Sequence, residues 1–183
     1  NPRIGLIFEP ASQTVVKVLY GESFLAPAPY FAYSHFGSFN GTTNASGQYV
    51  SNFFQLPNPG LQPEKSKTYE VNFTHHVTSN FILSGSTYYS NVCNLITAVL
   101  RNETSNFIPG GQILSYQRYE NAGEASIYGM EFKGDYHTHI GPVRLKLWGS
   151  YSWVDGHIEQ PGGALLQLPL VANHQVKTGA TFS

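Results

Sequence analysis

The residues best suited to contact a ligand are aromatic, and they gather in one long segment that lacks regular periodicity. Between residues 21 and 65 this segment is rich in Tyr and Phe, whose flat faces and, for Tyr, hydroxyl groups can stack on and hydrogen-bond to a large ligand. The candidate ligand contacts are Tyr30, Phe31, Tyr33, His35, Phe36, Tyr49, Phe53 and Phe54. The alternative is a loop that folds back on itself and packs its own aromatic side chains.

Histidines could bind a metal ion, but their positions argue against a metal site. His75 and His76 adjoin one expected turn, and His137 and His139 adjoin another. Imidazole is a good metal ligand, yet an amphipathic side chain beside a turn also suits an interface. We therefore expect no metal site and no cofactor.

The sequence does not favour an enzyme. Glu131 and Asp135 share one face of an expected strand, but Lys133 shares it too, so a solvated wall explains the carboxylates better than acid–base catalysis. No Gly-x-Ser-x-Gly nucleophile motif is present. Cys93 is the only cysteine, which excludes an internal disulfide and a cysteine-based zinc site.

Composition narrows the class of protein. The 183 residues carry 10 Lys and Arg against 11 Asp and Glu, and this lack of basic excess excludes nucleic acid as a partner. Charged residues make up 11% of the chain, whereas about 25% is usual in soluble domains. No run of about 18 apolar residues could form a membrane helix. Two classes remain, a secreted β-sandwich and a transmembrane β-barrel.

Alternation of apolar and polar residues predicts long two-faced strands. In the clearest case Tyr69, Val71 and Phe73 point to one side, while Glu70 and Asn72 point to the other. The fifth expected strand is predicted to be bulged near 121–123. The seven predicted strands run over about 4–8, 15–20, 68–74, 81–98, 113–137, 142–158 and 171–182.

The connections between these strands alternate between short and long. Short turns at one end and long loops at the other are typical of outer-membrane barrels. The expected turns are 10–13, 76–80 and 138–141, and the expected loops are the irregular segment 21–65, then 101–111 and 159–169. An interfacial girdle is expected from aromatic residues near strand ends, namely Tyr20, Tyr69, Tyr89, Tyr136, Tyr151 and Trp153. We therefore favour a barrel over a sandwich.

Five motifs in collinear order resemble TonB-dependent outer-membrane receptors. A strand ending in Tyr-Gly and followed by Phe-Leu-Ala-Pro is similar to the family's Tyr-Gly and Phe-Arg-Ala-Pro, with Leu25 in place of Arg. Residues 58–64 resemble Asn-Pro-x-Leu-x-Pro-Glu, and 121–131 resemble Asn-x-Gly followed by Ile-x-Gly-x-Glu. Residues 151–155 and 168–174 continue the order, although Ala172 replaces the last proline. The positions that carry the family motifs are Tyr20, Gly21, Phe24, Ala26, Pro27, Asn58, Pro59, Leu61, Pro63, Glu64, Gly129 and Glu131.

The resemblance implies an all-β fold, an antiparallel transmembrane β-barrel segment of about seven long strands. Residues 1–183 would be a partial barrel domain, without the plug domain and the C-terminus of the barrel. The implied location is the outer membrane of a Gram-negative bacterium, and the implied function is TonB-energised uptake of a large scarce ligand, most often a ferric siderophore. The implied partners are outer-membrane lipid, that ligand, and the inner-membrane TonB complex, contacted through a plug segment that is not in this chain.

One alternative from a different class stays open. A secreted all-β carbohydrate-binding module could use the same loop aromatics to stack on sugars. Such a module would be a soluble monomer without detergent, whereas a barrel segment would precipitate or require detergent.

Overall fold

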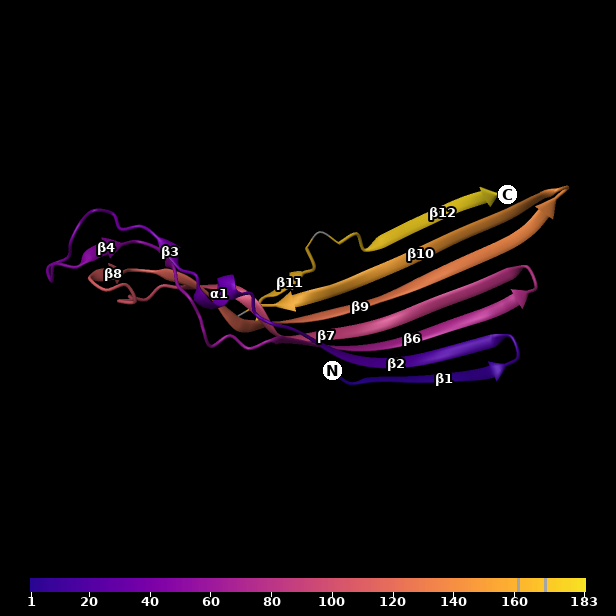
Figure 1. Cartoon of the computed structure of the whole chain (residues 1–183), viewed down its shortest axis with the longest axis horizontal. Helices are drawn as coiled ribbons and strands as arrows, with labels where there is room; N and C mark the ends of the chain where they lie inside the picture. Colours follow the sequence, from indigo (N-terminus) through magenta and orange to yellow (C-terminus); the bar gives the residue numbers. More distant parts are fainter. Residues whose placement is uncertain (161, 170) are drawn as a thin grey trace.

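The computed structural model describes residues 1–160, 162–169 and 171–183, and within them seven long strands form one antiparallel sheet. These strands are β1 (Arg3–Ala11), β2 (Thr14–Leu25), β6 (Glu64–Thr78), β7 (Phe81–Arg101), β9 (Tyr116–Ile140), β10 (Val143–Glu159) and β12 (His174–Phe182). Their order in the sheet is β1-β2-β6-β7-β9-β10, and β10 also pairs with β12 and with β11 (Leu165–Gln167). The predicted fold class is confirmed, and the sheet remains open rather than closing into a barrel (Figure 1).

Short turns and long connections lie at opposite ends of the sheet, as predicted (Figure 1). The turns are tighter than the sequence suggested, because they occupy only residues 12–13, 79–80 and 141–142. Gly141 adopts a φ of 60° in the last of them, a conformation that costs glycine little. The long connections at the other end leave the sheet toward α1, β3, β4 and β8 (Figure 1).

The predicted bulge at residues 121–123 is confirmed, and β7 carries a second irregularity opposite it. Leu95 pairs with Gly123 and Ile96 with Asn121, which leaves Ala122 without a partner in the register. On β7, Asn94 has a φ of 60° and is the one non-glycine residue with positive φ in the described ranges. Bulges bend strands, and beyond this point the β7–β9 hairpin extends away from the sheet (Figure 1).

The segment predicted to be irregular over 21–65 is partly regular, so that expectation was wrong. Strand β2 continues to Leu25 and β6 begins at Glu64, which shortens the connection to 26–63. It contains α1 (Pro29–Tyr33), β3 (Phe36–Gly37), β4 (Tyr49–Ser51) and β5 (Phe54–Gln55), and the next long connection ends on β8 (Gly111–Ile113). Strands of two or three residues are too short to show a two-residue period, so the sequence does not reveal them. Residues 26–63 and 102–115 are called the loop unit below.

Aromatic side chains form a level row across the apolar face of the sheet. Tyr20 pairs with Tyr69, Tyr69 with Tyr89, and Tyr89 with Tyr128. Trp153 extends the row, because its ring centroid lies 5.7 Å from that of Tyr128. We call these five residues the aromatic row. Such rows are typical of the boundary between lipid and water.

The opposite boundary of the apolar face lies near the short turns. There Phe81 pairs with Tyr136. From Tyr128 to Tyr136, β9 covers nine residues. A tilted transmembrane β-strand needs about 9–11 residues to cross the hydrocarbon core of a bilayer. The spacing between the two aromatic levels therefore suits a membrane.

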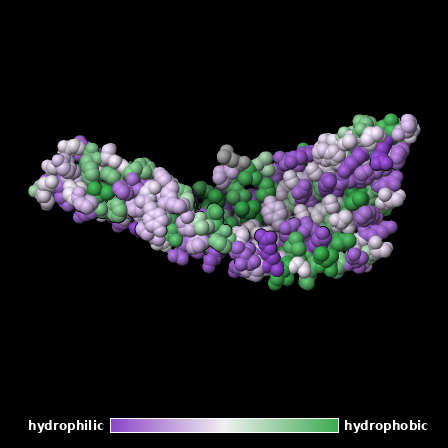
Figure 2. Space-filling view, in the orientation of Figure 1, coloured by the Kyte–Doolittle hydropathy of each residue, from purple (hydrophilic) through white to green (hydrophobic). Residues whose placement is uncertain are grey.

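The two faces of β6 differ as the alternation predicted. Tyr69 and Val71 are 52% and 42% exposed, whereas Glu70 and Asn72 are half-buried on the other face. Exposed apolar side chains also cover one face of β1, including Ile4, Leu6 and Phe8. Figure 2 shows hydrophobic residues gathered along the edge of the sheet formed by β1. In lipid such exposure is favourable, so the apolar face needs no further protein cover there.

No helix within the described ranges is long and apolar enough to cross a membrane.

We expect Val71→Arg to destabilise the sheet in a lipid bilayer by about 1–3 kcal/mol, because arginine on the lipid face of a barrel costs about 2–4 kcal/mol at the midplane and less near the interface. The matched control is Asn72→Arg, one residue away on the polar face, which should cost much less. Urea unfolding of the protein in lipid vesicles measures both. Equal losses for the two variants would contradict the assignment of the faces.

Candidate functional site

The loop unit is held together by a short parallel sheet between its two connections. Tyr49 pairs with Gly111 and Ser51 with Ile113 across β4 and β8. Ser51 is fully buried, its hydroxyl donates to the carbonyl of Ser38 at 2.6 Å, and its own carbonyl accepts from the Leu114 N–H at 2.8 Å. The two connections are therefore one hydrogen-bonded body rather than two independent loops.

A small hydrophobic core supports this body. Phe54, Leu56, Ile113 and Tyr116 are buried together, and Phe39 and Ile108 pack against them. Phe54 is only 5% exposed, so the side chain that the sequence placed among the ligand contacts fills the core instead. A Cβ on Gly37 would lie 2.5 Å from the Phe54 ring, which explains the glycine there. For Phe54 the alternative of a self-packed loop describes the structure.

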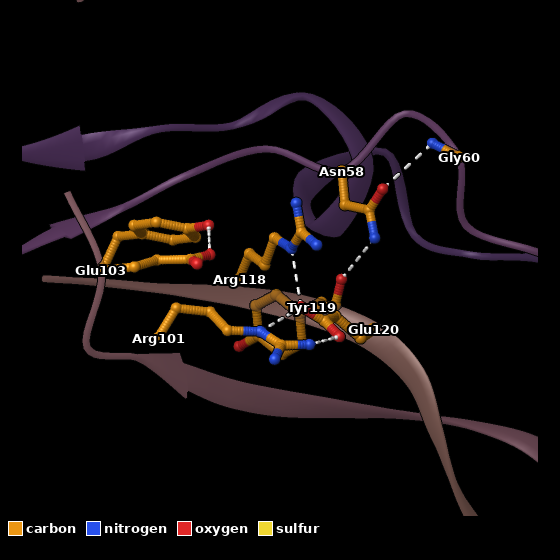
Figure 3. A network of polar contacts seen from close by, with 8 residues as sticks. Asn58, Gly60, Arg101, Glu103, Arg118, Tyr119 and Glu120 are labelled. Atoms are coloured by element: carbon orange, nitrogen blue, oxygen red, sulfur yellow. Dashed lines mark hydrogen bonds and ion pairs between the residues drawn. The ribbon is translucent and has the colours of Figure 1, made fainter. Parts of the chain in front are cut away.

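Helix α1 docks on the β7–β9 hairpin through a second aromatic contact. The Phe31 ring stacks on Tyr119 with centroids 4.0 Å apart, and Ala32 is buried beside it. The side-chain amide of Asn58 donates a hydrogen bond through Nδ2 to the carbonyl of Tyr119 at 2.8 Å, as Figure 3 shows. Phe31 is thus half-buried and anchors the helix, which leaves less of its surface for a ligand.

The other six predicted contacts are all exposed on the loop unit: Tyr30, Tyr33, His35, Phe36, Tyr49 and Phe53. Sequence reasoning missed Phe107, which comes from the other connection and is also exposed. Its ring meets His35 edge-on at 5.7 Å. No local signal separated Phe107 from an ordinary loop aromatic, because its neighbour is more than 70 residues away in the sequence. The structure thus brings His35 and Phe107 together.

Charged residues stiffen the hairpin between the sheet and the loop unit (Figure 3). The Glu120 carboxylate accepts from Arg101 Nε at 3.0 Å and from Arg118 Nε at 2.7 Å, and Arg101 Nη2 also pairs with it. The hydrogen bond from Arg101 lowers the pKa of Glu120 below its usual value. The Tyr116 hydroxyl donates to Glu103. Alternation shows which face of a strand a charged residue occupies but not which residue of the neighbouring strand it contacts, so the sequence gave no sign of the network.

The motif at residues 58–64 fastens the loop unit to the hairpin at the bulges. Gln62 N–H donates to Asn121 Oδ1 at 2.8 Å, and Asn121 Nδ2 donates to the carbonyls of Gln62 and Asn94, each at 2.8 Å. Glu64 accepts from the Ile96 N–H at 2.8 Å and so satisfies a backbone donor at the irregularity. Leu61 is buried within the same turn. The motif residues therefore do structural work, and none of these contacts requires a ligand.

The remaining motif positions support the sheet. Gly129 allows close packing, because a Cβ there would lie 2.7 Å from the Trp153 carbonyl and 2.7 Å from the Tyr88 hydroxyl. Glu131 lies on the polar face and lines a hollow of about 410 Å³ with Lys17 and Lys133. The other motif residues are in or near the end of β2 and the turn before β6, namely Tyr20, Gly21, Phe24, Ala26, Pro27, Pro59 and Pro63. Leu170, in the predicted motif at 168–174, lies outside the described residues. So does Pro161, in the predicted loop at 159–169.

The histidines that the sequence analysis considered and rejected as metal ligands lie near the short turns: His75, His76, His137 and His139. His75 Nδ1 is 2.8 Å from the Thr14 hydroxyl, which occupies one ring nitrogen. Over residues 1–160, 162–169 and 171–183, no three His, Cys, Asp or Glu side chains gather as a metal site.

Comparison with known proteins gives a family match over the whole length. A family model described as TonB dependent receptor-like, beta-barrel matches residues 1–183. The heme/hemopexin utilization protein C of Haemophilus influenzae (strain 86-028NP) is 26% identical over 172 residues, covering 90% of this chain and 22% of that protein.

Solved structures share the fold at low identity. The outer membrane transporter YddB from Escherichia coli aligns with a TM-score of 0.66 and 12% identity, covering 93% of this chain and 24% of that one. A double mutant of the Serratia marcescens hemophore receptor HasR, in complex with its hemophore HasA and heme, aligns with a TM-score of 0.56 and 20% identity, covering 83% and 21% of the two chains. The chain spans about a fifth of the length of the relatives that it matches.

We expect Asn121→Ala to loosen the loop unit, because three hydrogen bonds to Gln62 and Asn94 are lost. At a net cost of about 1.4 kcal/mol, local opening would become about ten times more frequent. Limited proteolysis of the membrane-inserted receptor should then cut within 26–63 about ten times faster. Asn102→Ala, at an exposed position of the same unit, is the control. Unchanged cutting in Asn121→Ala would show that the motif does not hold the loop unit.

Gly129→Ala should destabilise the sheet by roughly 1–3 kcal/mol, since the added Cβ must push apart β7, β9 and β10. Gly149→Ala is the matched control, because its Cβ would find no heavy atom closer than 3.7 Å. Urea unfolding of both variants tests the difference. A Gly129→Ala variant as stable as Gly149→Ala would refute the close approach.

Proposed function

Because this chain belongs to the TonB-dependent receptor β-barrel family, we propose that it forms part of the wall and of the external loops of an outer-membrane receptor that imports a large iron-bearing ligand. The sheet would lie in the outer membrane with the aromatic row at the external interface. The loop unit would project outside the cell. A secreted carbohydrate-binding module is not favoured, since family membership covers residues 1–183.

The observation that carries the proposal is the exposed aromatic surface on a fixed support. Tyr33 is 68% exposed, and Phe36 and Phe53 are also exposed, although the core beneath them is well packed. Exposed aromatic side chains on a hydrogen-bonded unit lose little conformational entropy when a ligand binds. They are therefore suited to contact a large ligand with an apolar or aromatic surface.

Uptake would draw its energy from the inner-membrane TonB complex, through a plug segment of the receptor that is not among these residues. This part of the proposal rests on the family alone. The chain itself would supply barrel wall and ligand contacts, without covalent chemistry.

Two iron-bearing ligands fit the proposal. A ferric siderophore is the ligand most often implied by the family resemblance. Heme is favoured by two relatives, the heme/hemopexin utilization protein and HasR with its bound heme. The two ligands differ in whether the His35 imidazole could coordinate their iron. Heme iron has axial positions that imidazole can occupy, whereas a siderophore surrounds the iron with its own donor atoms.

His35→Ala separates the two ligands. If heme is the cargo, the full receptor should bind hemin about tenfold more weakly, a loss of about 1.4 kcal/mol, and cells that depend on it should grow poorly on hemin. Hemin binding by spectroscopic titration measures the change, and His139→Ala, at an exposed residue near a short turn, is the control.

A siderophore receptor would give a different pattern. His35→Ala would then change uptake of a ferric siderophore only slightly, while Tyr33→Ala with Phe36→Ala would reduce it strongly. Cells carrying all of these variants and still importing both iron sources at the normal rate would refute the proposed role of the loop unit.

A further inference from the structure

Two lysines interrupt the apolar face beside the aromatic row. We propose that Lys65 and Lys67, together with the apolar hollow beneath them, bind a phosphate-bearing lipid of the surrounding leaflet. The inference rests on the proposed membrane orientation of the sheet. It does not depend on which ligand the receptor imports.

The side-chain alternation of β6 places both lysines on the lipid-facing side. Lys65 and Lys67 are exposed, in phase with exposed Tyr69 and Val71, while the residues between them are half-buried. The phase is unusual, because alternation puts the other mid-strand lysines on the polar face: Lys17, Lys133, Lys146 and Lys177. A charged residue on this face has to be justified by its depth or by a partner.

The depth of the two lysines fits lipid headgroups. Lys67 and Lys65 precede Tyr69 of the aromatic row by two and four residues, on the side of the loop unit. They are about 7 Å apart along the strand, so their flexible stems can bring both ammonium groups to one phosphate. Lysines close to an anionic membrane surface are attracted to it.

Neither lysine forms an ion pair with a carboxylate in the part of the chain that the structure describes. In the described part of the chain, the ion pairs involve other residues, at Arg101, Arg118, Lys133 and Lys146. Glu22 stands opposite Lys67 in the register, and its carboxylate accepts from the Tyr20 hydroxyl. The other cross-strand neighbours of the lysines are Phe24 on β2 and Asn91 and Cys93 on β7, and none of them is Asp or Glu. The local balance is therefore two positive charges against one negative charge.

Carboxylates farther along the same rim restrict where an anion can settle. Glu124 and Glu159 pair with each other across β9 and β10 and are both exposed. An anionic group would be repelled from that end and drawn to β6. Charge complementarity thus selects the segment between β2 and β7.

An apolar hollow of about 560 Å³ opens directly below the lysines. Its walls include Ile4, Leu6, Val18, Tyr69, Val71 and Tyr89. In a bilayer an acyl chain gains little hydrophobic free energy by entering such a hollow, because the surroundings are already apolar. The hollow therefore supplies shape, while the lysines supply the preference for phosphate. Free phosphate would contact only the lysines and would leave the hollow unused.

The test uses the full receptor that contains this chain, purified in a neutral detergent. Binding of bisphosphorylated lipid A, of the same lipid after phosphatase treatment, and of inorganic phosphate is measured by native mass spectrometry and by the shift in melting temperature. We expect lipid A to bind about tenfold more tightly than the dephosphorylated lipid, and this preference to weaken at high salt. Inorganic phosphate should not displace it at comparable concentrations.

The variant Lys65→Gln with Lys67→Gln should lose the tenfold preference, while Lys177→Gln, on β12, should retain it. If the double variant does not fold, each single variant should show part of the loss, and the comparison of the two lipids on the unaltered receptor stands by itself. Equal binding of the two lipids, full preference in the double variant, or displacement by inorganic phosphate would overturn the proposal. Iron uptake by the double variant should be normal, so failure here leaves the proposed import function untouched.

Discussion

The structure depends on one constraint, which is that a backbone surrounded by lipid must satisfy its N–H and C=O groups within the protein. Long antiparallel strands meet this requirement, and β6, β7 and β9 pair almost without interruption between the two aromatic levels. The same constraint explains the apolar face. When every backbone group is paired, side chains such as Val71 and Phe132 can meet lipid directly, and the polar alternate positions turn to the other side. An open sheet leaves unpaired backbone groups at β1 and β12, and the closed barrels of the family remove such edges.

The pairing is interrupted where the sheet ends and the loop unit begins, and there the motif residues replace backbone partners. The irregularities at Asn94 and Ala122 break the ladder between β7 and β9. The Glu64 carboxylate accepts a hydrogen bond from the Ile96 N–H, and the Asn121 side-chain amide donates one to the Asn94 carbonyl. The bulges and the motif therefore belong together: a bent hairpin creates unsatisfied groups, and the turn at 58–64 both satisfies them and fixes the loop unit.

The sequence predicted the sheet well because its signal is local. A two-residue period identifies a strand and its faces without knowledge of the partner strand, so the faces of β6 and the bulge near Gly123 could be foreseen. The loop unit could not, because β4 finds its partner β8 about 60 residues later and neither strand has enough residues to show a period. Phe54 was misplaced for the same reason, since only the contact with Ile113 shows that it belongs to a core. The network of Arg101, Arg118 and Glu120 was not predicted, because the sequence pattern of a strand does not identify the partner of a charged residue.

This division between local and remote signals also separates what the family motifs can tell from what they cannot. Asn58 and Glu64 make contacts to backbone groups, which every receptor with the same bend must satisfy whatever its ligand. Tyr33, His35 and Phe107 lie on the loop unit, which the contacts of Asn58 and Glu64 hold in place. Their side chains are exposed, and His35 and Phe107 contact each other edge-on. Changes at these exposed positions would alter the ligand surface without disturbing the contacts that Asn58 and Glu64 make with the hairpin. One motif-bearing scaffold can therefore present different ligand surfaces, which is why the motifs identify the family and leave the cargo to be decided at the exposed aromatic residues.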